Sequence, residues 1–97
     1  MNELNELIHQ PVRLRIMAAL SALGPREQVD FMFLKENLGL TDGNLGAHLR
    51  ALEEAGYVAS EKTFVARRPK TFLAATALGR KAFTAHVAAL TAILKPR

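Results

Sequence analysis

The sequence predicts a domain that is mainly α with a small β-hairpin, and three observations support this fold class. Its 97 residues are 49% hydrophobic, which fits one packed domain of ordinary size. Apolar residues recur at helical spacing along most of the chain, and glycine or proline separates the runs. The stretch 57–76 differs, because it is rich in β-branched and aromatic residues and contains a proline near its middle, which predicts two strands.

The first half of the chain is expected to hold four helices. A short helix within residues 1–10 would end before Pro11 and carry Leu4, Leu7 and Ile8 on one face. The second would begin at Pro11, where the missing N–H costs nothing, and end at Gly24. Its apolar positions are Val12, Ile16, Leu20 and Leu23. Residues 26–29 then predict a short extended piece.

Side chains that suit helix N-termini place the third and fourth helices. Asp30 is expected to cap the third, which would end at Gly39 and bury Phe31, Leu34 and Leu38. Thr41 is expected to cap the fourth, at about 41–55, and Asp42 complements the dipole of its first turn. The buried stripe of this fourth helix would be Leu45, Leu49 and Leu52.

The last third of the chain predicts a hairpin and a long helix. Residues 57–65 and 71–76 are the expected strands, and the polar segment 66–70 (ARRPK) is the expected loop between them. Thr76 would cap a terminal helix within 77–95. Two short helices joined by a tight turn and followed by a basic hairpin are typical of a winged helix-turn-helix.

Three segments resemble the MarR/ArsR-like winged helix-turn-helix transcriptional regulators of the small single-domain type. LTDGNLGAHLRALEEAGYV (40–58) resembles their recognition-helix segment, FVARRPKTFLAATALGRKAF (64–83) resembles their wing and following helix, and IHQPVRLRIMAAL (8–20) fits the same group. The resemblance covers nearly the whole chain. It implies that residues 1–97 are a single DNA-binding domain that regulates transcription. Similar regulators commonly place Ser or Arg near two positions that are Gly46 and Ala47 here.

The charge distribution favours double-stranded DNA as the partner. Residues 1–56 carry a net charge of −3 and residues 57–97 a net charge of +7. A one-sided basic region suits a polyanion, because each phosphate that it neutralises releases counterions. A second reading stays open, in which the domain is a protein–protein interaction module and the basic hairpin faces an acidic partner.

The fourth helix is expected to enter the major groove and the hairpin, at 64–72, to contact the minor groove or the backbone. On the helix, Asn44 would pair with adenine, and Arg50 would reach guanine or a phosphate. The predicted DNA-binding residues are Thr41, Asp42, Gly43, Asn44, Ala47, His48 and Arg50 on the helix, and Lys62, Arg67, Arg68, Lys70 and Thr71 on the hairpin.

The terminal helices are expected to form a homodimer interface. Phe83, Val87, Leu90 and Leu94 are spaced 4, 3 and 4 residues apart, as in a coiled-coil seam, and Leu4, Leu7 and Ile8 would join them. A dimer would place two domains on two half-sites. A further alternative is a sensor that binds an unknown small-molecule effector between these terminal helices.

The sequence gives little support to catalysis or cofactor binding. Cysteine is absent, which excludes thiolate metal sites, and no glycine-rich phosphate loop or nucleophile elbow is present. His9, His48 and His86 lie about 39 positions apart and do not have metal-ligand spacing. We therefore expect no enzyme activity, no cofactor and no metal. No signal peptide or apolar run of membrane length is found, so we expect a cytoplasmic protein with no membrane partner.

Overall fold

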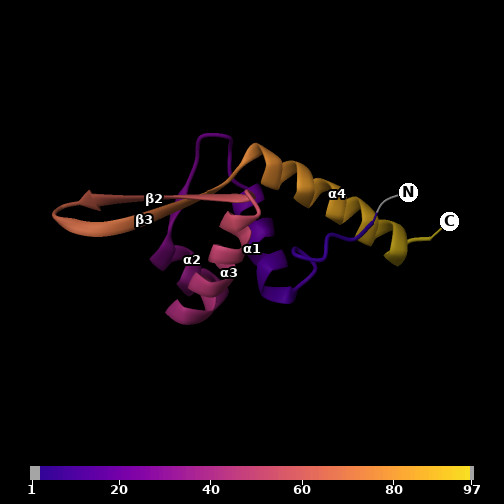
Figure 1. Cartoon of the computed structure of the whole chain (residues 1–97), viewed down its shortest axis with the longest axis horizontal. Helices are drawn as coiled ribbons and strands as arrows, with labels where there is room; N and C mark the ends of the chain where they lie inside the picture. Colours follow the sequence, from indigo (N-terminus) through magenta and orange to yellow (C-terminus); the bar gives the residue numbers. More distant parts are fainter. Residues whose placement is uncertain (1–2, 97) are drawn as a thin grey trace.

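Residues 3–96, which the computed structural model describes, form four helices and a three-stranded antiparallel sheet. The elements are α1 (Pro11–Ser21), β1 (Val29–Asp30), α2 (Phe31–Leu38), α3 (Asp42–Glu54), β2 (Val58–Val65), β3 (Arg68–Ala75) and α4 (Ala77–Leu94). The sheet order is β1-β3-β2. Figure 1 shows the β2–β3 hairpin extending to one side of the three-helix body and the C-terminal half of α4 extending to the other. The fold is the predicted winged helix, and no described helix is long and apolar enough to cross a membrane.

The core lies where α1, α2 and α3 meet the base of the sheet. Its buried side chains come from every layer: Ile8, Ile16, Met17, Leu20, Leu34, Leu45, Leu49, Leu52, Val58 and Leu73. Burying a side chain of this size contributes about 1.5–3 kcal/mol, so the cluster holds the short helices in place. The stripe predicted for the fourth helix is confirmed, because Leu45, Leu49 and Leu52 are all buried.

The predicted helix caps are confirmed. Asp30 accepts a hydrogen bond from Phe33 N, and Thr41 accepts one from Asn44 N. Thr76 accepts a bond from Gly79 N at the start of α4. Each pair satisfies a helix N–H that would otherwise lack a partner. Gly39 ends α2 in the left-handed conformation, with φ of 67°. The second predicted helix is shorter than expected, because α1 ends at Ser21 and not near Leu23.

At the base of the β2–β3 hairpin, the start of α4 comes close to the backbone that precedes β2. A Cβ added at Gly79 would lie 2.1 Å from the carbonyl oxygen of Tyr57. The Thr76 hydroxyl also donates to the carbonyl of Gly56, over 2.6 Å. Because Gly79 has no side chain, the first turn of α4 can lie directly against the backbone of Tyr57, just before β2.

The hairpin turn is tighter than predicted. Residues 66–70 were expected to form a loop, but the turn consists of Ala66 and Arg67 alone, and Arg68 already pairs with Val65. Both turn residues have positive φ, 52° and 67°, as a two-residue type I′ turn requires. Three residues of the expected loop therefore belong to β3, and the hairpin is longer and more regular.

Pro69 is compatible with this strand because of its register. Its partner across the ladder is Phe64. Pairs in an antiparallel ladder alternate, and Val65–Arg68 closes the turn, so the Phe64–Pro69 pair is of the kind that exchanges no backbone hydrogen bonds. The missing N–H of Pro69 faces the other edge, where β1 ends before reaching it. A proline at such an edge position keeps other strands from adding to it.

The predicted first helix is wrong for the described residues 3–10. Residues 6–8 form a turn, in which the Asn5 side chain accepts from Ile8 N and the Asn5 carbonyl accepts from His9 N. Gln10 N then bonds to the carbonyl of Ile8 only two residues back. Because Pro11 has no N–H to continue a ladder, one turn is too short to repay the cost of helix nucleation. Residues 1–2 of the expected helix lie outside the described part.

Candidate nucleic-acid interface

α3 presents an outer face that no other element covers. Its core side is occupied by the leucine stripe, and Asn44, Ala47 and Arg50 on the other side are exposed. Thr41, Asp42 and Gly43 at its start are exposed as well. A Cβ added at Gly43 or Gly46 would meet nothing within 4 Å, so neither glycine is required for internal packing. The helix therefore offers a smooth surface to which another backbone can come close.

An ion pair links the two helices of the helix-turn-helix. Lys35 Nζ on α2 lies 2.9 Å from Asp42 Oδ1 in the first turn of α3. Asp42 is therefore engaged within the fold, and its negative charge is partly neutralised at the end of α3 where an anion would approach. The pair helps to hold α3 at its angle to α2. The Asp42 side chain itself is largely exposed, so the energetic contribution is small.

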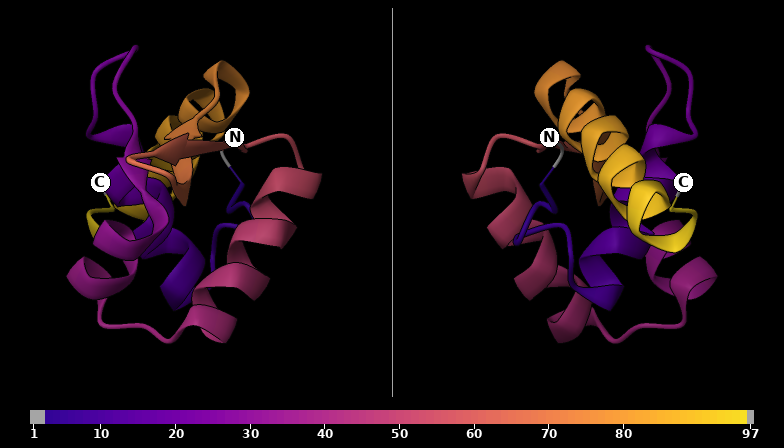
Figure 2. Two further views of the ribbon diagram at one scale, coloured as in Figure 1. Left: turned by 90° about the vertical axis from the view of Figure 1, so that its left-hand side faces the viewer. Right: turned by 90° about the vertical axis from the view of Figure 1, so that its right-hand side faces the viewer.

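His48 lies at the border between the outer face of α3 and the α1 side. Arg13 Nη1 lies 3.1 Å from His48 Nδ1, and Arg13 Nε donates to the carbonyl of Leu7. Because a guanidinium can only donate, His48 Nδ1 is the acceptor and its proton sits on Nε2. Arg13 thus joins the N-terminal segment, α1 and α3, which Figure 2 (right) shows side by side. Arg13 was not among the residues that the sequence singled out.

The hairpin divides its predicted contact residues between two faces. Side chains alternate along a strand, so Arg68 and Lys70 share one face of β3. Lys62 and Thr71 are directly paired across the strands and share the other. Arg67 occupies the tip. All of these are exposed except Thr71, which is half-buried. Seen along the hairpin in Figure 2 (left), α2 and α3 lie below it on either side.

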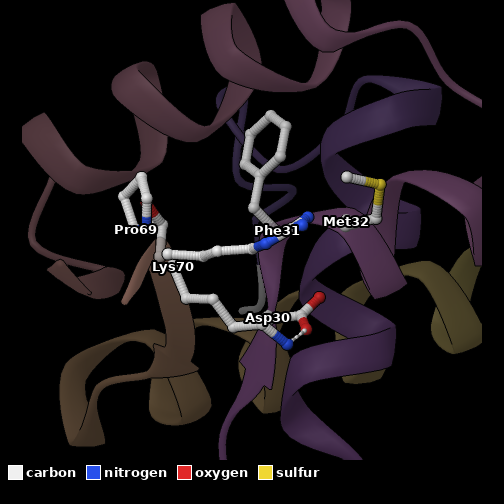
Figure 3. A pocket seen from close by; sticks show the side chains of 7 residues that line it. Asp30, Phe31, Met32, Pro69 and Lys70 are labelled. Atoms are coloured by element: carbon white, nitrogen blue, oxygen red, sulfur yellow. Dashed lines mark hydrogen bonds and ion pairs between the residues drawn. The ribbon is translucent and has the colours of Figure 1, made fainter. Parts of the chain in front are cut away.

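Lys70 does not stand alone, because it bridges the hairpin to α2. Its Nζ lies 3.1 Å from Asp30 Oδ2, and Figure 3 shows the pair at the edge of a groove of about 520 Å³ between β3 and the start of α2. The hydrogen bond from the Phe33 N–H lowers the pKa of Asp30 below its ordinary value, and the hydrogen bond from Lys70 adds a smaller effect in the same direction. Asp30 thus caps α2 and also links the start of that helix to β3 of the hairpin.

Arg80 belongs to the internal structure and not to the exposed basic surface. Its guanidinium donates to the carbonyls of Ser21, Leu23 and Gly24, at 2.9–3.2 Å. These carbonyls end α1 and begin the loop that follows, so Arg80 ties α4 to that loop. In the sequence Arg80 counts toward the basic region. No local pattern could separate it, because its partners lie more than fifty residues away.

His86 is fully buried on α4. Its Nδ1 accepts from Asn5 N over 2.9 Å, and its Nε2 lies 3.4 Å from His9 Nδ1. Burial lowers the pKa of His86 below its ordinary value, and the charge of His9 lowers it further. His48 lies apart, beside Arg13. Within residues 3–96, no three His, Asp or Glu side chains are grouped as a metal site would need.

The predicted interface residues of α4 divide into an inner and an outer set. Phe83 and Leu90 are half-buried against the body, whereas Val87 is 41% exposed and Leu94 is 70% exposed. Leu4 and Leu7 are half-buried, and Ile8 is fully buried in the core of its own chain. Ile8 therefore has no surface left for a partner. Ile93, which was not among the predicted interface residues, is 59% exposed beside Leu94.

Comparisons with known proteins agree with this architecture. The chain is 42% identical over 82 residues to an uncharacterized protein of Methanocaldococcus jannaschii, covering 84% of this chain and 86% of that protein. A solved structure, described as that of a transcriptional regulator homologue from Pyrococcus horikoshii OT3, superposes with a TM-score of 0.82 at 34% identity. The match covers 93% of this chain and 86% of that one. Residues 12–94 match the model of a protein family described as winged helix DNA-binding domain, and the chain therefore belongs to that family.

Proposed function

We propose that this protein is a transcriptional regulator that binds duplex DNA at specific sequences. α3 would lie in the major groove, and the β2–β3 hairpin would contact the minor groove or the phosphates beside it. One observation carries the proposal: α3, whose outer residues are exposed, and the cationic hairpin both lie away from the C-terminal half of α4 (Figure 1). We take residues 1–97 to act as one such domain.

Base contacts would come from few side chains. Asn44 and Arg50 are the exposed polar residues of α3 that match the donor and acceptor patterns of adenine and guanine. Gly43, Gly46 and Ala47 would allow a close approach of the helix backbone and apolar contact with thymine methyl groups. Thr41 and His48 would bind phosphates at the two margins of the helix, where backbone contacts set its register on the duplex.

The hairpin would supply most of the electrostatic attraction. Arg67 at the tip, Arg68 and Lys70 on one face and Lys62 on the other surround a strand pair that reaches away from the body. Thr71 adds a hydroxyl beside Lys62. Lys70 would exchange Asp30 for a phosphate when DNA is bound, since phosphate contacts outweigh an exposed ion pair.

We also propose that the protein acts as a homodimer through α4. The outer set on this helix, Val87, Ile93 and Leu94, leaves large apolar side chains in water beyond the body of the domain. A two-fold pairing of α4 would cover them and place two copies of α3 on successive half-sites. Leu4 and Leu7 would flank this contact. The assignment to the small single-domain MarR/ArsR-like regulators rests on the resemblance of segments 8–20, 40–58 and 64–83.

Selection of bound sequences from random duplex DNA tests the function directly. We expect enrichment of one sequence with two related halves. On the selected duplex, the Asn44→Ala variant should lose about 1–3 kcal/mol of binding free energy, and its preference at one base pair in each half of the site should be relaxed. Asn37→Ala is the matched control, because Asn37 is an exposed asparagine on α2. A chain that enriches no sequence, or an Asn44→Ala variant that behaves as Asn37→Ala does, would contradict the proposal.

A further inference from the structure

Phe64 is the most exposed large apolar side chain among residues 3–96. It is 74% exposed and lies in β2, one residue before the end of the strand. A phenylalanine that could be buried forgoes about 1.5–3 kcal/mol of favourable transfer when it stays in water. Nothing in the described part of the chain covers it. The ring is therefore available to contact a partner outside the domain.

The register places Phe64 directly opposite Pro69. Pairs that exchange no backbone hydrogen bonds have their side chains closest together, so the ring and the pyrrolidine form one apolar unit. Pro69 has a fixed φ, and the Phe64 side chain has only two rotatable bonds to restrict. A partner could thus cover this unit at a small cost in conformational entropy.

The face that carries this unit is defined along the strand. Phe64 alternates with Lys62, Ser60 and Val58, and Val58 is buried in the core. Ser60 on this face donates a hydrogen bond to Glu53 at the end of α3. The face that starts against the proposed recognition helix therefore ends in Phe64. Val65, the next residue, is 45% exposed on the opposite face.

Cations surround the apolar unit and limit what can cover it. Lys62 lies two residues before Phe64 on the same face and Arg67 is at the tip, whereas Arg68 and Lys70, the neighbours of Pro69 in the chain, lie on the opposite face of β3. An ordinary apolar protein surface would have to bury or desolvate several of these charges at high cost. The minor groove of duplex DNA instead offers phosphates for the cations and sugar and base surfaces for the ring.

We propose that Phe64 and Pro69 form an apolar wedge that enters the minor groove beside Arg67 and bends the duplex there. The inference rests on the proposed function and adds to it an apolar contact with DNA that is independent of the contacts between cations and phosphates. Apolar side chains inserted between base steps unstack them and kink DNA, and pyrimidine–purine steps yield most easily. The wedge would thus favour sites with such a step under the hairpin, without any hydrogen bond to a base.

The test measures DNA bending and affinity together. A selected duplex with a dye at each end reports bending by energy transfer, and its dissociation constant is measured at several salt concentrations. Phe64→Ala should reduce the bend and weaken binding by about 5- to 30-fold with an unchanged salt slope. Phe64→Leu should keep most of the bend, because leucine also acts as a wedge. Val65→Ala, the matched control on the opposite face, should bind and bend DNA as the unaltered protein does.

Three other outcomes would contradict either the wedge alone or the proposed function as well. If Phe64→Ala bends and binds DNA as the unaltered protein does, the wedge is refuted while the proposed function stands. If Phe64→Ala and Val65→Ala lose affinity equally, hairpin folding and not the wedge is responsible, and the inference again fails. If the unaltered protein binds no duplex but binds vesicles of anionic lipid through Phe64, both the wedge and the proposed function fail.

Discussion

The buried imidazole of His86 accepts a hydrogen bond at Nδ1 from the backbone N–H of Asn5, over 2.9 Å. The ring proton must then be on Nε2, which faces His9 Nδ1 at 3.4 Å. The Asn5 side chain extends the contact, because its amide donates to the hydroxyl of Tyr57. One neutral tautomer of His86 thus fastens the N-terminal segment to α4 in place of the helix that the sequence predicted.

This arrangement makes stability depend on pH. Because the pKa of His86 is lowered by folding, the unfolded chain takes up the proton first as pH falls. The free energy of unfolding should therefore be at its maximum above about pH 6.5 and decrease as pH falls toward the lowered pKa. Urea unfolding at a series of pH values measures it.

His86→Gln is the informative variant, since its amide oxygen can still accept from Asn5 but does not titrate. We expect a free energy of unfolding lower by about 1–3 kcal/mol at neutral pH and a flatter dependence on pH. A His86→Gln protein with the original pH slope would assign the effect to another group.

Arg80 should matter for stability and not for DNA binding. Arg80→Ala removes the donor to three carbonyl oxygens at the end of α1 and should lower the free energy of unfolding by about 1.5–3 kcal/mol. Lys81→Ala is the control, because the neighbouring Lys81 is exposed and its replacement should change stability by less than about 0.5 kcal/mol. Equal effects of the two substitutions on urea unfolding would show that the bonds from Arg80 to these carbonyls contribute little.

A charge on the outer set of α4 should break the proposed dimer. Leu94→Glu is preferable to a change at half-buried Leu90, because Leu94 is 70% exposed and is not needed for the core. Two like charges at a two-fold interface add repulsion to desolvation, so a monomer with unchanged circular dichroism is expected. Sedimentation equilibrium measures the mass. Met32→Glu, at an exposed apolar position on α2, should remain dimeric; a Leu94→Glu dimer would remove α4 from the interface.

The sequence predicts the elements whose signals are local. The caps Asp30, Thr41 and Thr76 could be predicted because a helix cap bonds to a residue only two or three positions further along the chain. The buried leucines of α3 could be predicted because their helical spacing places them on one face. The hairpin turn escaped prediction, because Ala66 and Arg67 adopt positive φ without the Asn-Gly pattern that usually marks such turns.

Contacts between distant residues could not be predicted. Asn5 and His86 are 81 positions apart, and Arg13 meets His48 across 35. The apolar spacing of Leu4, Leu7 and Ile8 suited a helix, yet Leu7 and Ile8 pack onto the core from a single turn held by Asn5. The spacing of apolar residues on α4 likewise could not show which of them are half-buried and which are exposed, because that depends on how far the rest of the domain extends along the helix.

The salt dependence of duplex binding tests the central claim most directly, which is that the hairpin cations and α3 bind DNA together. The logarithm of the binding constant should fall linearly with the logarithm of salt concentration. Replacing Arg67, Arg68 and Lys70 together with alanine should weaken binding to every sequence and reduce that slope by roughly 1–3 units, because each phosphate that is no longer neutralised lowers it by about one. An unchanged slope in a folded triple variant, or an unaltered protein whose binding does not respond to salt, would contradict the account.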